Sequence, residues 1–225
     1  MKILVVTPIT KEVNCFLHSC AEQGIRSETM MLGKLPVTHF PALGIIVAQG
    51  GLGKVQFAVQ TQHLIETCPG LHVVICAGAA GALVDALTVG DVVVATETVE
   101  HDIRNKFGPP LLPRFRSGEV LVETFKKLPV VSQAFQVYFG PIASGDEDVI
   151  DAARRQEIQQ LTGALVVAWE GAGGARACEF SGLPFVEIRG VTDSANSTAS
   201  ADFARNLHRA LCNVATVITL WAKAY

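Results

Sequence analysis

The sequence predicts an α/β domain in which helices cover the faces of a sheet. Apolar runs typical of buried strands alternate with segments of helical periodicity along all 225 residues. The chain has 49% hydrophobic and only 17% charged residues, so it can bury a large core. No repeat, linker or low-complexity tract divides it. We therefore expect residues 1–225 to fold as a single domain.

The first half of the chain gives alternating strand and helix signals. Strands are predicted where apolar runs are bounded by turn residues, at 2–8, 44–49, 72–77 and 91–96. A helix is expected from about Thr10, whose hydroxyl can cap it. A second helix is expected over 54–67, after the glycine-rich turn at 50–53. The small residues at 78–81, between two predicted strands, allow backbones to approach closely.

The second half opens with a proline-rich segment at 101–116, which is expected to be an irregular, functional loop. Beyond it, strands are predicted at 136–143, 164–167 and 184–191. Helices are predicted at 151–161, 170–181 and 201–223. In the last helix, an apolar stripe indicates core packing or a subunit contact. The stripe comprises Phe203, Leu207, Leu211, Val214, Ile218 and Trp221.

Charge and cysteine usage exclude several classes of partner. The formal net charge of −3 leaves no basic surface for nucleic acid or an anionic membrane. The six cysteines are scattered and lack zinc-ligand spacing, so we expect no disulfide framework and no metal site. They are typical of reduced, mostly buried thiols, and we expect a cytoplasmic protein. The apolar run after Lys2 is too short for a signal peptide.

Several motif matches fail on their spacing. Lys54 follows a glycine-rich turn, but a phosphate-binding Walker loop needs Ser or Thr next, and Val55 stands there. A dinucleotide fingerprint needs glycines in the first strand-to-helix turn; the turn at 7–10 has none, so we expect no cofactor. The acidic run at 145–149 lacks the spacing of a calcium loop. The His-Asp pair at 101–102 has no serine in a nucleophile elbow to complete a triad.

Three carboxylates are each predicted at the end of an element. Glu12 follows the first strand, Glu170 the strand at 164–167, and Asp193 the strand at 184–191. If these strands are parallel, their carboxyl ends share one edge and the side chains converge. Carboxylate pairs cleave glycosidic bonds, one protonating the leaving group and the other activating water. The alternative is that all three are surface helix caps, with Asp193 in an Asx turn.

Short motifs follow one another along nearly the whole chain. They are Pro8-Ile-Thr-Lys-Glu12-Val, Gly51-Leu-Gly-Lys54-Val, Gly78-Ala-Ala-Gly81, Val89-Gly-Asp91-Val-Val-Val, Ala143-Ser-Gly-Asp146, Trp169-Glu170-Gly-Ala and Arg189-Gly-Val-Thr-Asp193-Ser-Ala. In this order they resemble the purine nucleoside phosphorylase superfamily, most closely its methylthioadenosine/S-adenosylhomocysteine nucleosidase branch. The resemblance implies a three-layer α/β/α sandwich around a mixed, partly barrel-like central sheet. It also implies cleavage of a purine nucleoside into free base and sugar.

The resemblance gives each of the three carboxylates a role. Asp193 matches the general acid that protonates the purine N7, and desolvation at a strand end can raise the pKa of such an acid. Glu12 matches the base that positions the attacking water. Glu170 matches the carboxylate that grips the ribose hydroxyls and steadies the oxocarbenium-like sugar.

Further positions are assigned in the same way. Ala79 and Val149 match residues that line the substrate site. Ser194 and Arg189 are placed to support the reacting groups, Arg189 because residues four apart on a strand face the same side as Asp193. The alternative is that Ser194 is a cap and Arg189 belongs to a structural ion pair.

Two departures from the nucleosidase pattern concern the substrate. Where that branch has an aromatic residue stacked on adenine, this chain has Glu147 and Asp148. Where it has a Glu-Met-Glu run, this chain has Ala168-Trp169-Glu170. We expect Trp169 to pack against the ribose or the base. Asp148 is expected either to face solvent or to read a base edge other than adenine's.

Water is the expected nucleophile. Phosphorolysis needs arginines and hydroxyls around an anion, but residues 78–81 have no hydroxyl and the turn after the first strand has no arginine. A carboxylate at Glu12 would also repel phosphate. Phosphate-dependent phosphorolysis is the alternative reaction, and a non-catalytic nucleoside-binding module is the alternative from another class.

The proline-rich loop indicates a second subunit. Its segment 107–113 sits where the family covers the 5′ end of a neighbouring subunit's ligand, so Phe107 and Pro113 are expected to contact substrate across an interface. Phe107, Leu111, Leu112 and Phe115 would be costly to expose on a monomer. We expect a homodimer whose reactants are a purine nucleoside and water.

Overall fold

The computed structural model of the protein describes residues 1–108, 111–129 and 134–225. Its strands are β1 (Ile3–Thr7), β2 (Glu28–Leu32), β3 (Leu35–Phe40), β4 (Ile45–Gln49), β5 (Val73–Ala82), β6 (Val92–Glu100), β7 (Arg114–Arg116), β8 (Val137–Ser144), β9 (Val166–Ala168) and β10 (Phe185–Asp193). Its helices are α1 (Thr10–Glu22), α2 (Lys54–Thr67), α3 (Glu119–Lys126), α4 (Ala152–Thr162), α5 (Gly171–Ser181) and α6 (Ala199–Ala224). The predicted alternation of strands and helices is confirmed.

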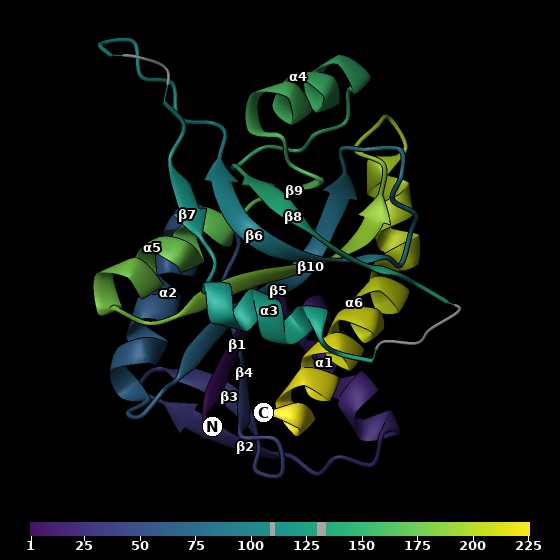
Figure 1. Ribbon diagram of the computed structural model, residues 1–225. Helices are drawn as coiled ribbons and strands as arrows, with labels where there is room; N and C mark the ends of the chain where they lie inside the picture. Colours follow the sequence, from purple (N-terminus) through teal and green to yellow (C-terminus); the bar gives the residue numbers. More distant parts are fainter. Residues whose placement is uncertain (109–110, 130–133) are drawn as a thin grey trace.

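Five of the strands close into a ring. β10 is parallel to β5 and antiparallel to β6, β8 is parallel to β6 and β9, and β9 returns to β5. From β5 the sheet continues as an open extension through β1, β4, β3 and β2, and β7 pairs with β6. This is a mixed, partly barrel-like sheet of the kind that the resemblance implies (Figure 1).

Helices cover both faces of the sheet beside the ring. α1 packs against α6 on one face and α2 against α5 on the other (Figure 1). The alternation along β1 explains this layering, because successive side chains point to opposite faces. Ile3 and Val5 join the apolar core with α1 and α6, whereas Leu4 and Val6 join the core with α2 and α5. All five residues of β1 are buried, as a strand covered on both faces requires.

The parallel strands bring distant loops to one edge. β4 and β5 both run parallel to β1, and β10 runs parallel to β5. Their carboxyl ends therefore point the same way, and the segments that follow them gather where the ring begins. No helix among the described residues is long and apolar enough to cross a membrane.

The structure also corrects several sequence-based boundaries. Residues 78–81, which the sequence places between strands, continue β5, because their small side chains allow pairing with β10 as far as Asp193. Within the segment predicted to be irregular, Arg114–Arg116 forms β7; Pro109 and Pro110 of that segment lie outside the described residues. The apolar pattern does not predict β2, β3 or α3. Four of the five β2 residues are exposed and β3 contains Pro36, so neither strand is a buried apolar run.

Candidate active site

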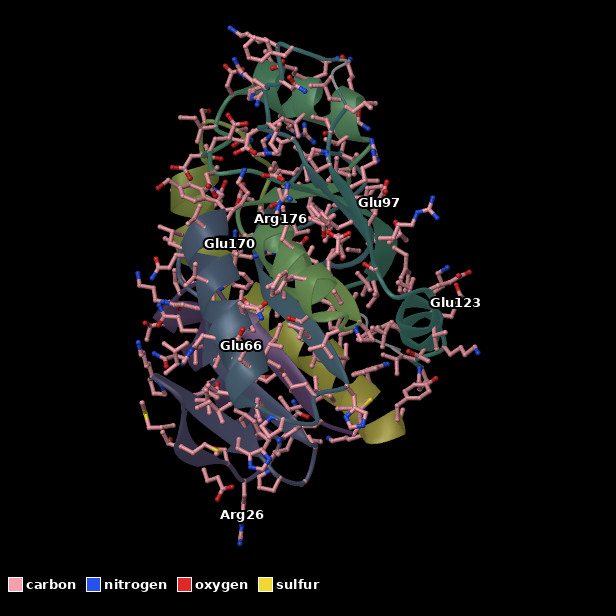
Figure 2. All side chains as sticks on the ribbon, turned by 90° about the vertical axis from the view of Figure 1, so that its left-hand side faces the viewer. Arg26, Glu66, Glu97, Glu123, Glu170 and Arg176 are labelled. Atoms are coloured by element: carbon pink, nitrogen blue, oxygen red, sulfur yellow. The ribbon has the colours of Figure 1, made fainter. Side chains whose placement is uncertain are left out.

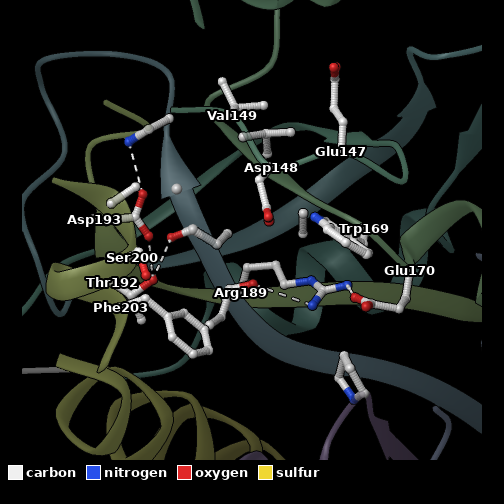
Figure 3. A pocket seen from close by; sticks show the side chains of 18 of the residues that line it. Glu147, Asp148, Val149, Trp169, Glu170, Arg189, Thr192, Asp193, Ser200 and Phe203 are labelled. Atoms are coloured by element: carbon white, nitrogen blue, oxygen red, sulfur yellow. Dashed lines mark hydrogen bonds and ion pairs between the residues drawn. The ribbon is translucent and has the colours of Figure 1, made fainter. Parts of the chain in front are cut away.

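A cavity of about 490 Å³ opens at the edge where the parallel strands end. Its walls come from the turn after β1, the turn before α2, the end of β5, the loop after β8, the β9–α5 turn, the end of β10 and the start of α6. Figure 3 shows Arg189 of β10 beside Glu170, with Asp193 of β10 on the other side of Arg189, among the residues that line it. Glu12 lines it from the first turn of α1. The structure therefore brings all three predicted carboxylates into one cavity.

Glu12 is held by backbone donors on both sides of its carboxylate. The Ala79 N–H donates to Oε1 (2.8 Å) and the Ile9 N–H donates to Oε2 (3.2 Å). Glu12 thus caps α1 in place of Thr10, whose hydroxyl donates to the side chain of Gln49 instead. Burial raises the pKa of Glu12 to about 7, although the Ala79 hydrogen bond and the Arg189 charge act against it. A carboxylate of this pKa can accept a proton at neutral pH.

Glu170 lies where the amino-terminal ends of α2 and α5 meet. It is the N-cap residue of α5. Its Oε1 also accepts from the N–H of Gly53 (3.4 Å), which is the N-cap residue of α2. In Figure 2, α2 and α5 lie side by side with Glu170 near their ends. Burial raises the pKa of Glu170, while Arg189 lowers it. The two helix N-termini act with Arg189 against the effect of burial, because their partial positive charge favours the carboxylate form.

The turn that carries Glu170 is fixed by Ser144 at the end of β8. The Ser144 hydroxyl donates to the Trp169 carbonyl (2.7 Å) and accepts from the Ala172 N–H (2.9 Å). Ser144 is fully buried. This pair of hydrogen bonds joins the barrel strand to the first turn of α5 and restricts where Glu170 can point.

Asp193 ends β10 just after an irregularity in its pairing with β5. The Thr192 hydroxyl donates to Oδ2 (2.8 Å) and the Ala195 N–H donates to Oδ1 (2.9 Å). The second bond is the Asx turn that the sequence allows, yet Asp193 lines the cavity as well. Burial raises the pKa of Asp193 against the lowering effect of both hydrogen bonds. A Cβ at Gly81 would lie 2.8 Å from Oδ1, so the opposite strand must be free of a side chain there.

Arg189 does not support Asp193 as the strand periodicity suggests. Its guanidinium donates to Glu187 (Nε to Oε1, 2.7 Å) and to Glu170 (Nη2 to Oε2, 3.4 Å). The pairing shift between Val191 and Asp193 breaks the simple alternation that the prediction assumes. Arg189 is the ion-pair residue of the alternative reading, and its partner at Glu170 lines the cavity.

The opposite wall is formed by the loop after β8 and by Trp169. Val149 is buried at the cavity wall, and Ala79 lines the floor near Glu12. Figure 3 shows Asp148 pointing into the cavity on the side of Trp169. The Asp148 carboxylate forms no hydrogen bond or ion pair with the part of the chain that the structure describes. A polar side chain is therefore available to a ligand at a wall that is otherwise largely apolar.

Other predicted site residues lie elsewhere. Ser194 is exposed and is not part of the cavity wall. Phe107 is fully exposed and Pro113 is half-buried, and neither lines the cavity. Their contact with a neighbouring subunit's ligand stays a prediction. Among the described residues, no group of three His, Cys, Asp or Glu side chains could hold a metal ion.

Phe203 is the main wall residue that sequence reasoning missed. It begins the apolar stripe of α6, and the structure places it at the cavity beside Asp193 (Figure 3). The sequence signal that could have identified Phe203 is its position in the first turns of the helix that follows Asp193, close to the reacting group. Thr192, which donates to Asp193, was also missed, because its type and position are those of an ordinary buried strand residue.

Comparison with known proteins places the chain among nucleoside-cleaving enzymes. Residues 2–221 match the family model of the phosphorylase superfamily. The chain is 30% identical to a 5′-methylthioadenosine/S-adenosylhomocysteine nucleosidase of Geobacillus thermodenitrificans, over 97% of this chain and 94% of that protein.

Solved structures agree. One is the 5′-methylthioadenosine/S-adenosylhomocysteine nucleosidase of Neisseria meningitidis in complex with methylthio-immucillin-A (TM-score 0.86, 29% identity, 100% and 99% of the two chains). Another is a futalosine hydrolase of Helicobacter pylori (TM-score 0.87, 26% identity, 100% and 98%). The family match, the ring of strands and the carboxylate-lined cavity lead to one conclusion: this chain belongs to the phosphorylase superfamily.

Proposed function

We propose that this protein is a purine nucleosidase that hydrolyses the N-glycosidic bond of a purine nucleoside. The observation that carries the proposal is the meeting of Glu12, Glu170 and Asp193 in one cavity, where burial raises the pKa of all three carboxyls. The similarity to nucleosidases over nearly the full chain supports the same reaction.

In the proposed mechanism, Asp193 is the proton donor. Its carboxyl protonates N7 of the purine, so the base leaves as a neutral molecule. The raised pKa of Asp193, which burial causes, favours the protonated form that this role requires. A bound base would exclude further water from Asp193 and strengthen the effect.

The sugar end is served by the other two carboxylates. Glu170 accepts hydrogen bonds from the ribose hydroxyls, and its charge stabilises the positive charge that develops on the sugar. Glu12 accepts a proton from the attacking water, since a pKa of about 7 leaves it partly ionised at neutral pH. The added hydroxyl completes free ribose or its 5′-modified form.

Water is preferred to phosphate as the nucleophile. Arg189 is the arginine of the cavity wall, and its charge is already shared between Glu187 and Glu170. Ionised Glu12 and Glu170 at the sugar site would repel an incoming phosphate dianion. Phosphorolysis would need cationic groups that this cavity wall does not offer.

The substrate is a purine nucleoside, and the similar nucleosidases are named for nucleosides with a modified 5′ position, methylthioadenosine and adenosylhomocysteine. Asp148 takes the place of a stacking aromatic residue and points into the cavity, so it supports a base whose ring N1 carries a hydrogen, as in hypoxanthine, over adenine, whose N1 is an acceptor. Trp169 lines the same wall and can pack against the ribose or the base.

Base release measured with and without phosphate tests this function. We expect hydrolysis of at least one substrate among methylthioadenosine, adenosylhomocysteine, adenosine, inosine and futalosine, at a rate that phosphate does not change. Strict dependence on phosphate would establish phosphorolysis instead. Nucleoside binding without base release would establish a non-catalytic binding module. Strong preference for methylthioadenosine would contradict the role given to Asp148.

We also propose a cytoplasmic homodimer. All six cysteines are free thiols, as expected in a reducing compartment. Phe107 and Leu111 are 104% and 76% exposed, which supports burial against a second subunit. Leu112 and Phe115 are instead half-buried in this chain, where Phe115 packs against the Arg176 guanidinium.

The dimer is tested by light scattering of the purified protein. We expect the mass of two chains, and replacement of both Phe107 and Leu111 by Ser should shift the mass toward one chain. Replacement of exposed Met31, on β2 at the other end of the molecule, serves as the control. A wild-type mass equal to one chain would rule the dimer out.

A further inference from the structure

Glu187 is a fully buried carboxylate that lies behind the cavity and is not part of its wall. It stands in the middle of β10, where all nine residues are buried. Its neighbours Val186 and Ile188 join the core with α1 and α6, so Glu187 and Arg189 point to the opposite face. A carboxylate in a strand interior is unfavourable unless it is paired, so the partners of Glu187 indicate its role.

Both oxygens of Glu187 have short contacts. Arg189 Nε donates to Oε1 (2.7 Å) and the Thr98 hydroxyl donates to Oε2 (2.6 Å). The carboxylate also lies against Gly171, the first residue of α5, where any Cβ would overlap it. Glu187 thus packs directly against the helix turn that begins after Glu170, whose N–H groups carry a partial positive charge.

Arg189 links Glu187 to the cavity. Toward the cavity its contacts are longer, 3.4 Å each to the Ala79 carbonyl and to Glu170 Oε2. Glu12 is close on the same side, because a Cβ at Gly78 would touch the Arg189 guanidinium and would lie 3.0 Å from Glu12 Oε1. One guanidinium therefore lies between Glu187 on one side and two cavity carboxylates on the other, and its shortest contact is with Glu187.

We propose that Glu187 is a positioning residue for the hydrolysis. By accepting a hydrogen bond from Arg189 Nε, it sets how strongly the guanidinium charge attracts Glu170 and Glu12. The proposal rests on the nucleosidase function proposed above. With Glu187 in place, Glu170 remains free to accept the ribose hydroxyls and Glu12 remains basic enough to take a proton from water. Without the Glu187 charge, Arg189 would bind these two carboxylates more strongly.

The charges around Glu12 fix the sign of the expected effect. Burial raises the pKa of Glu12, Arg189 lowers it and Glu170 raises it. Other titratable groups line the same space or lie beside it, namely Glu187, Asp193, Glu147, Asp148, Cys76 and Cys15. Loss of the Glu187 charge leaves the Arg189 charge less neutralised, so the pKa of Glu12 falls and its ionised form persists to lower pH.

The test is Glu187→Gln, which keeps the shape of the side chain. The amide oxygen can still accept from Arg189 Nε, and the amide N–H₂ can donate to the Thr98 hydroxyl, so the packing is preserved. With the best substrate, kcat and KM are measured from about pH 5 to pH 9. We expect the acid limb of kcat/KM to move to lower pH by about half a unit or more, less than the ~1–3 units of a charge in direct contact. KM should rise about threefold or more, because Arg189 then competes for Glu170.

Two further variants make the result decisive. Glu97→Gln removes the same charge one residue from Thr98, where Glu97 pairs with Arg114 at the surface, and should leave the profile unchanged. Thr98→Val removes one hydrogen bond from Glu187, so the Glu187 carboxylate interacts more strongly with Arg189. Less of the Arg189 charge then acts on Glu12, and the acid limb should move to higher pH. This opposite shift tests the proposal even if Glu187→Gln does not fold.

The outcomes separate the two proposals. Wild-type protein that hydrolyses no nucleoside would overturn the proposed function, and it is measured first. If the wild type is active, a folded Glu187→Gln protein with the wild-type acid limb and KM would overturn the role of Glu187. So would shifts of the same sign in Glu187→Gln and Thr98→Val, or no shift in Thr98→Val when Glu187→Gln is unfolded.

Discussion

Asp193→Asn is expected to lower kcat/KM for base release by about 10²–10⁴-fold, the usual contribution of a general acid. The amide cannot give a proton to the purine N7, so the base must leave as an anion. The fold should be retained, because the amide oxygen can still accept from the Ala195 N–H and the Thr192 hydroxyl can rotate to accept from the amide nitrogen. Steady-state kinetics with a purine nucleoside measures the loss, and binding of the nucleoside should change little.

The matched control is Asp85→Asn, which removes an exposed carboxylate paired with Arg155 outside the cavity. Its activity should equal that of the wild type. A ribose derivative whose leaving group departs readily without protonation, such as a nitrophenyl riboside, should recover much of the lost rate in Asp193→Asn. Wild-type activity in Asp193→Asn with a natural purine would show that the proton comes from elsewhere.

Glu12→Gln is expected to lose hydrolysis and to gain stability at alkaline pH. The activity falls because the amide cannot accept a proton from water, and the acid limb that Glu12 gives to the wild type, near pH 7, disappears with it. The stability rises because the wild type buries a carboxylate whose pKa is raised from 4.5 to about 7. At 1.36 kcal/mol per unit, the ionised carboxylate costs on the order of 3 kcal/mol above neutral pH.

The sign of the stability change follows from proton binding. Between about pH 4.5 and pH 7 the folded wild type holds a proton that the unfolded chain has released, so its stability falls as pH rises. Glu12→Gln has no such loss, although its single acceptor oxygen serves the Ala79 and Ile9 donors less well at every pH. Urea unfolding at pH 5 and pH 8 should show a difference from wild type that grows with pH.

Glu66→Gln, on the exposed side of α2, is the control for this series and should show no pH-dependent difference. A Glu12→Gln protein whose stability follows the wild type at both pH values would show that Glu12 is not desolvated in the folded protein. Retained hydrolysis would separately remove Glu12 from the mechanism.

The sequence predicted the site best where chemistry and strand ends coincide. Glu12, Glu170 and Asp193 stand out as carboxylates beside apolar runs, and parallel pairing of β1, β5 and β10 brings Glu12 and Asp193 together. Glu170 follows β9, which is antiparallel to β5, so the expectation of parallel strands is wrong there and the closing of the ring brings Glu170 to the cavity. Phe203 escaped notice because an aromatic residue on an apolar helix stripe looks the same whether it faces a core or a ligand.

Secondary structure, too, was predictable only where a local pattern in the sequence indicates it. Fully buried strands such as β1 are visible as apolar runs, whereas β2 and β3 are partly exposed and have no such pattern. The extension of β5 through residues 78–81 depends on its pairing with β10, which no local pattern in the chain encodes.

The sequence alone thus determined the α/β class, the order of its main elements and the three carboxylates at strand ends. The reason is that buried strands and amphipathic helices produce local patterns of apolar residues. Only the tertiary structure decided how these groups interact. It closed the ring of β5, β6, β8, β9 and β10, buried Glu12 enough to raise its pKa to about 7, and turned Arg189 away from Asp193 toward Glu187 and Glu170. The physical reason is that desolvation and charge pairing depend on distances between segments far apart in the chain, which strand pairing and helix packing alone establish.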